Sequence, residues 1–260
     1  MADEEQNMTF WDHLEVLRWT IFRVLIALAI LVVCCFIAMP YIFDPFILGP
    51  TDSDFFIYRL LSGLGGDGKL APDFTKPFHV DIININVASQ FLTHITTSFW
   101  LSLVLVFPYL IYEIWKFLKP ALYDNEMGSV RSAFLSGTGL FYLGCAVGYC
   151  IVFPIAFRFL SGYTIGNTIT NQINLNSYMG LFLGMVFIMG VAFELPILAW
   201  ILSKLGILKK SFLKEYRRYA VVVLLVLAAL ITPTGDPFTL AIVFLPLYLL
   251  YEASILVVRE

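Results

Sequence analysis

Long apolar stretches separated by polar segments dominate the chain. Four of them run over about residues 19–39, 88–114, 133–157 and 177–202. A helix needs about 17–25 predominantly apolar residues to cross the hydrocarbon core of a bilayer. The pattern therefore predicts four transmembrane helices at these positions.

A fifth apolar block, residues 219–258, is interrupted by the sequence TPTGDPFT. Pro233 breaks a helix and Asp236 resists burial in lipid. We therefore predict two short helices, over 219–231 and 239–258, joined by a tight turn. The first would span roughly 20 Å, less than the roughly 30 Å of hydrocarbon. We expect the turn to lie below the headgroups or the bilayer to thin there.

The expected fold is an all-α polytopic membrane protein with six transmembrane helices, the last two short, in a single domain over residues 1–260. Composition agrees, since 60% of the residues are hydrophobic and 13% are charged, with a mean hydropathy of +0.85. Soluble domains have about 45–50% apolar and about 25% charged residues. This balance excludes a soluble enzyme, a disordered chain and a nucleic-acid binder.

The distribution of charge predicts the orientation in the membrane. Lysines and arginines are concentrated near both termini and in the second and fourth loops, whereas the long first loop, about residues 40–87, is acidic. Because cytoplasmic loops carry an excess of Lys and Arg, both termini are predicted to lie in the cytoplasm. The first ten residues are acidic and lack the basic region of a cleavable signal peptide.

Residues that hold metals or perform covalent chemistry are scattered. The four cysteines lie inside apolar stretches and the three histidines are far apart. Neither a disulfide framework nor a zinc motif is therefore expected. The chain also lacks the short motifs of hydrolases and metalloproteases. We expect no enzymatic activity, catalytic residue, cofactor or bound metal.

One acid, Glu194 in the sequence GVAFELPIL, lies deep in an apolar stretch. A charged residue at the centre of a membrane helix costs about 2.5–3.5 kcal/mol on insertion scales, and such residues are usually functional. Pro196 weakens the helix and frees a backbone carbonyl. The functional interpretation is a polar contact inside a water-lined concavity. The structural alternative is a buried glutamate bonded to a neighbouring helix.

The first half of the second helix is polar for a membrane segment. Gln90 and Thr93 lie there among other amide and hydroxyl side chains. Such side chains either line a wet cavity or form hydrogen bonds between helices.

Glycines recur four residues apart in the third and fourth apolar stretches, as Gly144 with Gly148 and Gly180 with Gly184. Small residues at this spacing let two helices approach closely in lipid. Both pairs are predicted to be helix-packing contacts.

The segment WKFLKPALYDNE, after the second helix, mixes aromatic, basic and acidic residues. Aromatic residues and lysines are typical of a membrane interface, but acids on the cytoplasmic side oppose the usual trend. Asp124 and Glu126 are therefore candidates to receive a cationic ligand, as are Asp12 and Glu15 near the amino terminus.

Several motifs occur in a fixed order: HLEVLR, FLKPALYDNE, LFYLG, VFP, GVAFELP and TPTGDPFT. Together they resemble TatC, the multispanning subunit of the twin-arginine protein translocase, over about residues 12–252. The resemblance implies a receptor in the bacterial cytoplasmic membrane for folded export substrates. Their signal peptides carry two consecutive arginines, and transport uses the proton-motive force without nucleotide.

The resemblance also implies which residues bind the signal peptide. The family's acid after the PALY stretch maps to Glu126, and Phe117, Pro120 and Leu122 belong to the same signal-binding segment.

A second acid of the family lies in an amino-terminal HL-x-E-L-R pattern. Here Glu15 stands one place early and Val16 occupies the usual acidic position. One residue is about a 100° turn on a helix, so Glu15 faces another direction, and Asp12 is a compensating candidate.

By the same resemblance, Glu194 faces a concave side that meets single-helix TatA- or TatB-like partners, together with Gln90 and Thr93. Pro233 and Asp236 belong to the periplasmic turn, and self-association in the complex is expected. The alternative is a secondary transporter or channel with Glu194 as its ion or proton site. Such proteins often carry several intramembrane charges and paired repeats, and we find one deep acid and no repeat in the sequence.

Overall fold

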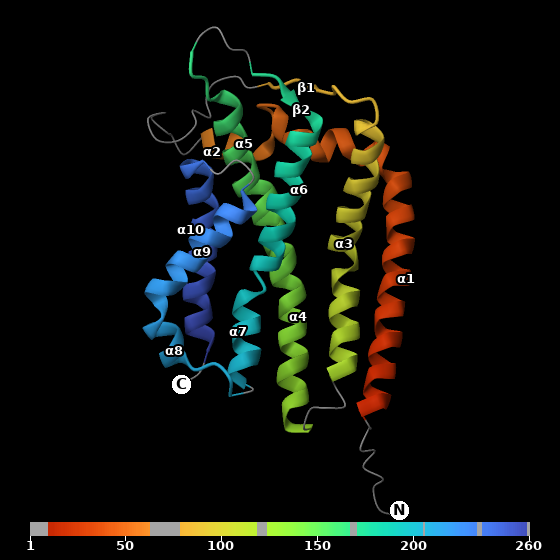
Figure 1. Ribbon diagram of the computed structural model, residues 1–260, viewed down its shortest axis with the longest axis vertical. Helices are drawn as coiled ribbons and strands as arrows, with labels where there is room; N and C mark the ends of the chain where they lie inside the picture. Colours follow the sequence, from red (N-terminus) through yellow and green to blue (C-terminus); the bar gives the residue numbers. More distant parts are fainter. Residues whose placement is uncertain are drawn as a thin grey trace, which may run out of the picture.

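Helices follow the long axis of the molecule, as the computed structural model in Figure 1 shows. The structure describes residues 10–62, 79–118, 124–166, 171–204, 206–232 and 236–258. α1 begins and α10 ends at the same end of the bundle, at the bottom of Figure 1, which we call the terminal end. We call the opposite end, where α2, β1 and β2 lie, the cap end.

Within the described residues, five helical stretches are long and apolar enough to cross a membrane. They contain these helices: α1 (Phe10–Ile42), α3 (Ser89–Leu118), α4 (Asp124–Val147), α6 (Leu175–Ala192) and α10 (Pro237–Val257). α1 and α3 extend beyond the apolar stretches because polar residues at their ends continue the same helix.

The last two helices differ from each other in length. α9 (Arg217–Ile231) has 15 residues, or about 22 Å of helix, which is less than the roughly 30 Å of hydrocarbon. α10 has 21 residues, or about 31 Å, which is enough to cross. The description of both as short is therefore wrong for α10. The predicted range 239–258 already has 20 residues, about 30 Å of helix, and the observed helix begins two residues earlier, at Pro237, directly after its N-cap Asp236, and ends at Val257.

The third and fourth apolar stretches are interrupted. After α4, a π-helical turn, η4 (Gly148–Val152), leads into α5 (Phe153–Gly162), where Pro154 cannot donate a helical hydrogen bond. After α6, a turn at Phe193 and Glu194 precedes α7 (Leu195–Lys204). The fourth stretch, predicted as one helix, is therefore two. The physical reason is Pro196, which removes a backbone donor in the first turn of α7.

The predicted outer loop contains ordered elements at the cap end. These are η1 (Phe43–Ile47), η2 (Gly49–Thr51), α2 (Phe56–Ser62) and β1 (Ile82–Ile83). β1 pairs in parallel with β2 (Ile173–Asn174), so the fold contains a minimal sheet that the all-α prediction omitted. Strands of two residues carry too short a pattern to be recognised in a sequence.

Polar contacts hold the cap together and tie it to the bundle. The Tyr58 hydroxyl donates to the carbonyl oxygens of Pro50, at 2.9 Å, and Pro154, at 3.2 Å. Burial raises the pKa of Tyr58, so the phenol remains a neutral donor. Asp52 accepts a hydrogen bond from the Asp54 backbone N–H, which lowers the pKa of its carboxyl, and it lies 3.3 Å from His79. These contacts connect segments that are distant in sequence.

The hydrophobic core is centred on α6. Met185 and Met189 of α6 are fully buried, as are Phe153 of α5 and Val243 of α10. α1 lies at the edge of the molecule, where it packs mainly on α3 (Figure 1). A large part of α1 is therefore left for lipid or partners.

Candidate functional site

Most of the predicted signal-binding residues lie at the terminal end of three helices. Asp12 and Glu15 are in the first two turns of α1, Phe117 is next to the last residue of α3, and Glu126 is in the first turn of α4. These helix ends lie at the same end of the bundle (Figure 1). The side chains of Asp12 and Glu126 are outside the described part, as are Pro120 and Leu122 altogether.

Glu15 and Val16 present different faces of α1. The Glu15 side chain is 62% exposed and forms an i,i+3 ion pair with Arg18 at 3.5 Å, where Arg18 is equally exposed. Val16 is half-buried, and Thr20, one turn further along the same face, is buried. The family's acidic position therefore lies on the inward side of α1, whereas the acid of this chain faces outward.

A polar cluster that the sequence did not reveal joins α1 to α3. Arg23 donates from Nε and Nη2 to the same carboxylate oxygen of Glu113, at 3.0 and 2.7 Å. The Tyr109 hydroxyl donates to the other oxygen at 3.0 Å, and Arg23 Nη2 also donates to Thr20 Oγ1 at 3.0 Å. The Glu113 side chain is only 3% exposed, whereas that of Arg23 is 38% exposed, so the carboxylate is buried between the helices and the guanidinium is partly open to the surroundings.

Arg23 and Glu113 were missed because each was interpreted alone. In the sequence, Arg23 follows Trp19 by one turn, as an anchoring charge of the amino-terminal tail would, and Glu113 lies within the apolar stretch 88–114. The signal that identifies them is their pairing: opposite charges in two consecutive membrane segments, each about one turn inside an interface. Intramembrane charges almost always pair with one another. The statement that Glu194 is the one deep acid was therefore wrong.

Glu194 lies in the turn between α6 and α7 and points toward α4. A β-carbon built on Gly137 of α4 would be 3.0 Å from Glu194 Oε2. Its Oε1 is buried and has no hydrogen-bond partner among the described residues. The structural alternative, a glutamate bonded to a neighbouring helix, is therefore not met at this oxygen.

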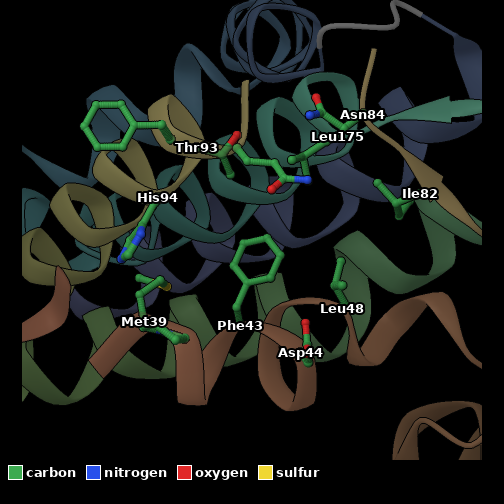
Figure 2. Close-up of a pocket in the computed structure, with 12 residues that line it drawn as sticks. Met39, Phe43, Asp44, Leu48, Ile82, Asn84, Thr93, His94 and Leu175 are labelled. Carbon is green, nitrogen blue, oxygen red and sulfur yellow. The ribbon is translucent and has the colours of Figure 1, made fainter. Parts of the chain in front are cut away.

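Gln90 and Thr93 lie far from Glu194. Both line a cavity of about 520 Å³ at the cap end, which His94 and Asp44 also line (Figure 2). Glu194 is 19 residues after the start of α6 at the cap end, which is about 28 Å along a helix. The structure therefore does not bring these three predicted partner-binding residues together.

Asp236 has a structural function at the start of α10. Its Oδ1 accepts a hydrogen bond from the Thr239 backbone N–H at 2.7 Å, which caps the helix. Pro233 lies outside the described residues. Among the described residues, no group of three or more His, Cys, Asp or Glu side chains could hold a metal ion.

Comparisons with known proteins agree on one family. The model of the family described as Sec-independent protein translocase protein (TatC) matches residues 12–246. A TatC from Blattabacterium sp. subsp. Periplaneta americana is 35% identical over 98% of this chain and 96% of its own length. The TatC of Escherichia coli K12 is 34% identical over 67% of each chain.

A solved structure is similar over nearly the whole fold. It is a crystal structure of the twin arginine translocase receptor TatC, with a TM-score of 0.73 and 28% sequence identity. The match covers 94% of this chain and 97% of that one.

Proposed function

We propose that this chain, which belongs to the TatC family of Sec-independent protein translocase proteins, binds twin-arginine signal peptides. In this proposal it is the core of a complex that exports folded proteins across the bacterial cytoplasmic membrane. The family consists of protein translocase components rather than enzymes. Family membership favours this function over an ion-transporting one.

The proposed orientation places the terminal end in the cytoplasm, with six spans and a concave face within the membrane. Support comes from the positive charges at this end: Lys116, Lys204, Lys209, Lys210, Arg217 and Arg218. Cytoplasmic ends of membrane proteins carry such an excess. The shared location of the start of α1 and the end of α10 agrees with both termini being cytoplasmic (Figure 1).

The observation that carries the proposal is the convergence of acidic helix ends at the terminal end. α1 brings Asp12 and Glu15, α4 brings Glu126 within its first turn, and α3 ends beside them with Phe117. Two adjacent arginines present planar, permanently charged forks that match carboxylates. Salt screens charges beyond about 8 Å, so recognition requires direct contact.

The ion pair between Glu15 and Arg18 is exposed, so an arginine of a ligand can compete with Arg18 for the Glu15 carboxylate. Exposed ion pairs contribute little to stability, because water and salt compete with them. An arginine of the signal peptide can therefore replace Arg18 beside Glu15 at little cost. The apolar part of the signal peptide then meets the exposed side chains of α1, where Phe22 is 51% and Ile26 is 57% exposed.

The test is site-specific photo-crosslinking of a twin-arginine precursor to the full chain in membranes. We expect Glu126→Lys to reduce crosslinking about ten-fold or more, since one charge-assisted hydrogen bond is lost and repulsion is added. The matched control is Glu215→Lys, an exposed acid of α8 (Lys210–Glu215) outside the proposed site. Equal crosslinking by the Glu126→Lys variant and the unaltered chain would refute the assigned role.

Complementation of a translocase-deficient strain tests the function as a whole. We expect the unaltered chain to restore export of a folded twin-arginine reporter. No export despite normal insertion would contradict the proposal, and uptake of a solute by the purified chain in liposomes would favour the transporter alternative.

We further propose that the chain self-associates and meets single-helix TatA- or TatB-like partners through Glu194. Support comes from its unpaired buried oxygen, which needs a donor. We expect Glu194→Ala to reduce co-purification of the single-helix subunits more than binding of the precursor. Normal co-purification and export by this variant would contradict the assignment.

A further inference from the structure

One face of α1 carries Val16, Thr20 and Arg23. The three residues are spaced by four and then three positions, so they share one side of the helix. Val16 is half-buried, Thr20 is buried and Arg23 reaches across to Glu113 of α3, the helix on which α1 mainly packs. The contact between the two helices is therefore apolar near the terminal end, at Val16, and charged about 10 Å deeper, at Arg23.

The carboxylate of Glu113 is held in place by its own helix. Tyr109, one turn earlier on α3, donates its hydroxyl to Oε1 at 3.0 Å. The side chain of Glu113 is 3% exposed, so few other positions are open to it. Because this hydrogen bond lies within α3, the carboxylate keeps its place whichever guanidinium is bound to its other oxygen.

Arg23 holds Glu113 by an arrangement that permits exchange. Both of its donors bond one oxygen of the carboxylate, whereas the strongest arginine–carboxylate pairs use two parallel hydrogen bonds, one to each oxygen. The Arg23 side chain is 38% exposed, and a long arginine side chain near a helix end can place its charge at the membrane interface. Arg23 can therefore leave Glu113 without becoming an unpaired buried charge.

We propose that Glu113 binds one arginine of the signal peptide and that Arg23 occupies this carboxylate until the peptide arrives. This assignment rests on the proposed function, which supplies the two arginines. The incoming guanidinium displaces Arg23, which turns to the interface. Because one guanidinium replaces another, the buried carboxylate is paired before and after the exchange, and the cost of an unpaired buried charge is avoided. Arg23 is thus an internal competitor of the ligand.

Glu113 also supplies an acid where α1 lacks one. Val16 occupies the family's acidic position on the inward face of α1, and Glu15 faces outward. Glu113 brings a carboxylate to the same helix contact from α3. Phe117 of the proposed signal-binding segment follows Glu113 by four residues, so the two lie on one side of α3, about 6 Å apart along its axis. An arginine bound at Glu113 therefore stays beside the residues already assigned to the signal peptide.

The first experiment measures the affinity of a fluorescent twin-arginine signal peptide for the purified full chain in nanodiscs. We expect Arg23→Met to lower the Kd about five- to ten-fold, because the peptide no longer competes with an internal arginine. An ion pair with a purely structural function predicts a raised or unchanged Kd, and either result would overturn the assignment. The matched control is Arg59→Met, which removes an exposed arginine paired with Asp54 at the cap end and should leave the Kd unchanged.

A milder variant decides the sign if Arg23→Met does not fold. Arg23→Lys keeps the positive charge but lacks the planar fork, so it holds the carboxylate less firmly than arginine does. We expect a Kd about two-fold lower than that of the unaltered chain. A Kd equal to or higher than that of the unaltered chain would overturn the assignment.

A double-mutant cycle between chain and peptide tests for direct contact. In the Arg23→Met background, Glu113→Gln should weaken binding of the twin-arginine peptide about ten-fold, because the charged acceptor is lost. The same change should have little effect on a peptide whose contacting arginine is replaced by glutamine. Each arginine is replaced in turn to identify the one that makes the contact. Coupling of Glu113 with neither arginine would overturn the contact, whatever the result with Arg23→Met alone.

Thermal unfolding gives a readout that a purely structural pair would not move. Saturating peptide should raise the Tm of Arg23→Met more than that of the unaltered chain, because tighter binding to the folded state stabilises it further. Equal shifts would contradict the exchange. If the unaltered chain binds the twin-arginine peptide and the Arg23 variants bind it no more tightly, the exchange fails and the proposed function stands. If the unaltered chain does not distinguish this peptide from one with two glutamines, the proposed function fails and the exchange with it.

Discussion

The α4–α6 and α1–α3 interfaces hold their helices together by different kinds of contact, close packing in the first and polar bonds in the second. At α4–α6, glycines bring backbones into direct contact: a β-carbon on Gly144 would lie 2.9 Å from Gly190 Cα. At α1–α3, two polar contacts join the helices. Arg23 pairs with Glu113, and His94 Nε2 lies 2.8 Å from the Phe36 carbonyl oxygen.

The difference reflects how many neighbours each helix has. α6 contacts α3, α4, α5 and α9 and lies in the core, so shape complementarity can hold it. α1 leaves most of its apolar side chains exposed, including Ile30 at 59% and Val33 at 60%. Lipid tails are as apolar as these side chains, so burial gives little driving force and directional polar bonds provide the association. We therefore predict that added side-chain volume destabilises the central α4–α6 interface, and that loss of a charged side chain destabilises the peripheral α1–α3 interface.

The largest effect should come from adding one methyl group to the central interface. Gly144→Ala places a β-carbon 2.5 Å from the Met189 carbonyl oxygen and 2.9 Å from Gly190 Cα, both backbone atoms. Neither can move alone, so we expect a loss of about 3 kcal/mol, at the upper end for overpacking. Thermal unfolding in detergent measures it, with Gly139→Ala as the control that changes little. A fully stable Gly144→Ala variant would show that the helices can separate without cost.

An intermediate effect is expected from breaking the ion pair. Arg23→Met leaves the Glu113 carboxylate, 3% exposed, without its charged partner. We expect its Tm to fall by several degrees, and the double variant Arg23→Met with Glu113→Gln to regain most of this loss, since no buried charge remains. The check is a double-mutant cycle on Tm in detergent. Additive losses in the double variant would mean that the two side chains act independently.

The smallest effect should follow removal of one hydrogen bond from a neutral donor in the same cluster. Tyr109→Phe deletes the hydroxyl that donates to Glu113 Oε1 at 3.0 Å. We expect a loss of about 1 kcal/mol, or about 2–4 °C in Tm. The loss should vanish when Glu113→Gln and Arg23→Met are already present, if the hydroxyl acts mainly on the charged carboxylate. Tyr112→Phe, on an exposed side chain of the same helix, serves as the control.

The apolar stretches predicted the membrane class and the approximate positions of the spans, because the bilayer thickness imposes a length on each helix. The break at Phe193 and Glu194 could be predicted only as a weakness at Pro196, since neighbouring helices decide whether a proline bends or ends a helix. The acids proposed for signal binding lie on helix ends that share one end of the bundle, and their side-chain roles remain predictions.

The sequence by itself determined that this protein belongs in lipid and which family it resembles, because composition, the length of apolar runs and ordered motifs are properties of the chain read in one dimension. Only the tertiary structure decided that Gly144 and Gly148 lie against the backbone of α6 whereas Gly180 has no neighbour within 4 Å of a built β-carbon. It also decided that Arg23 meets Glu113 and that Glu194 lies far from Gln90 and Thr93. The physical reason is that association in lipid depends on close packing and on polar pairs between helices. Such contacts join residues many positions apart, here 90 for Arg23 and Glu113, and the hydrophobic pattern along the chain contains no record of them.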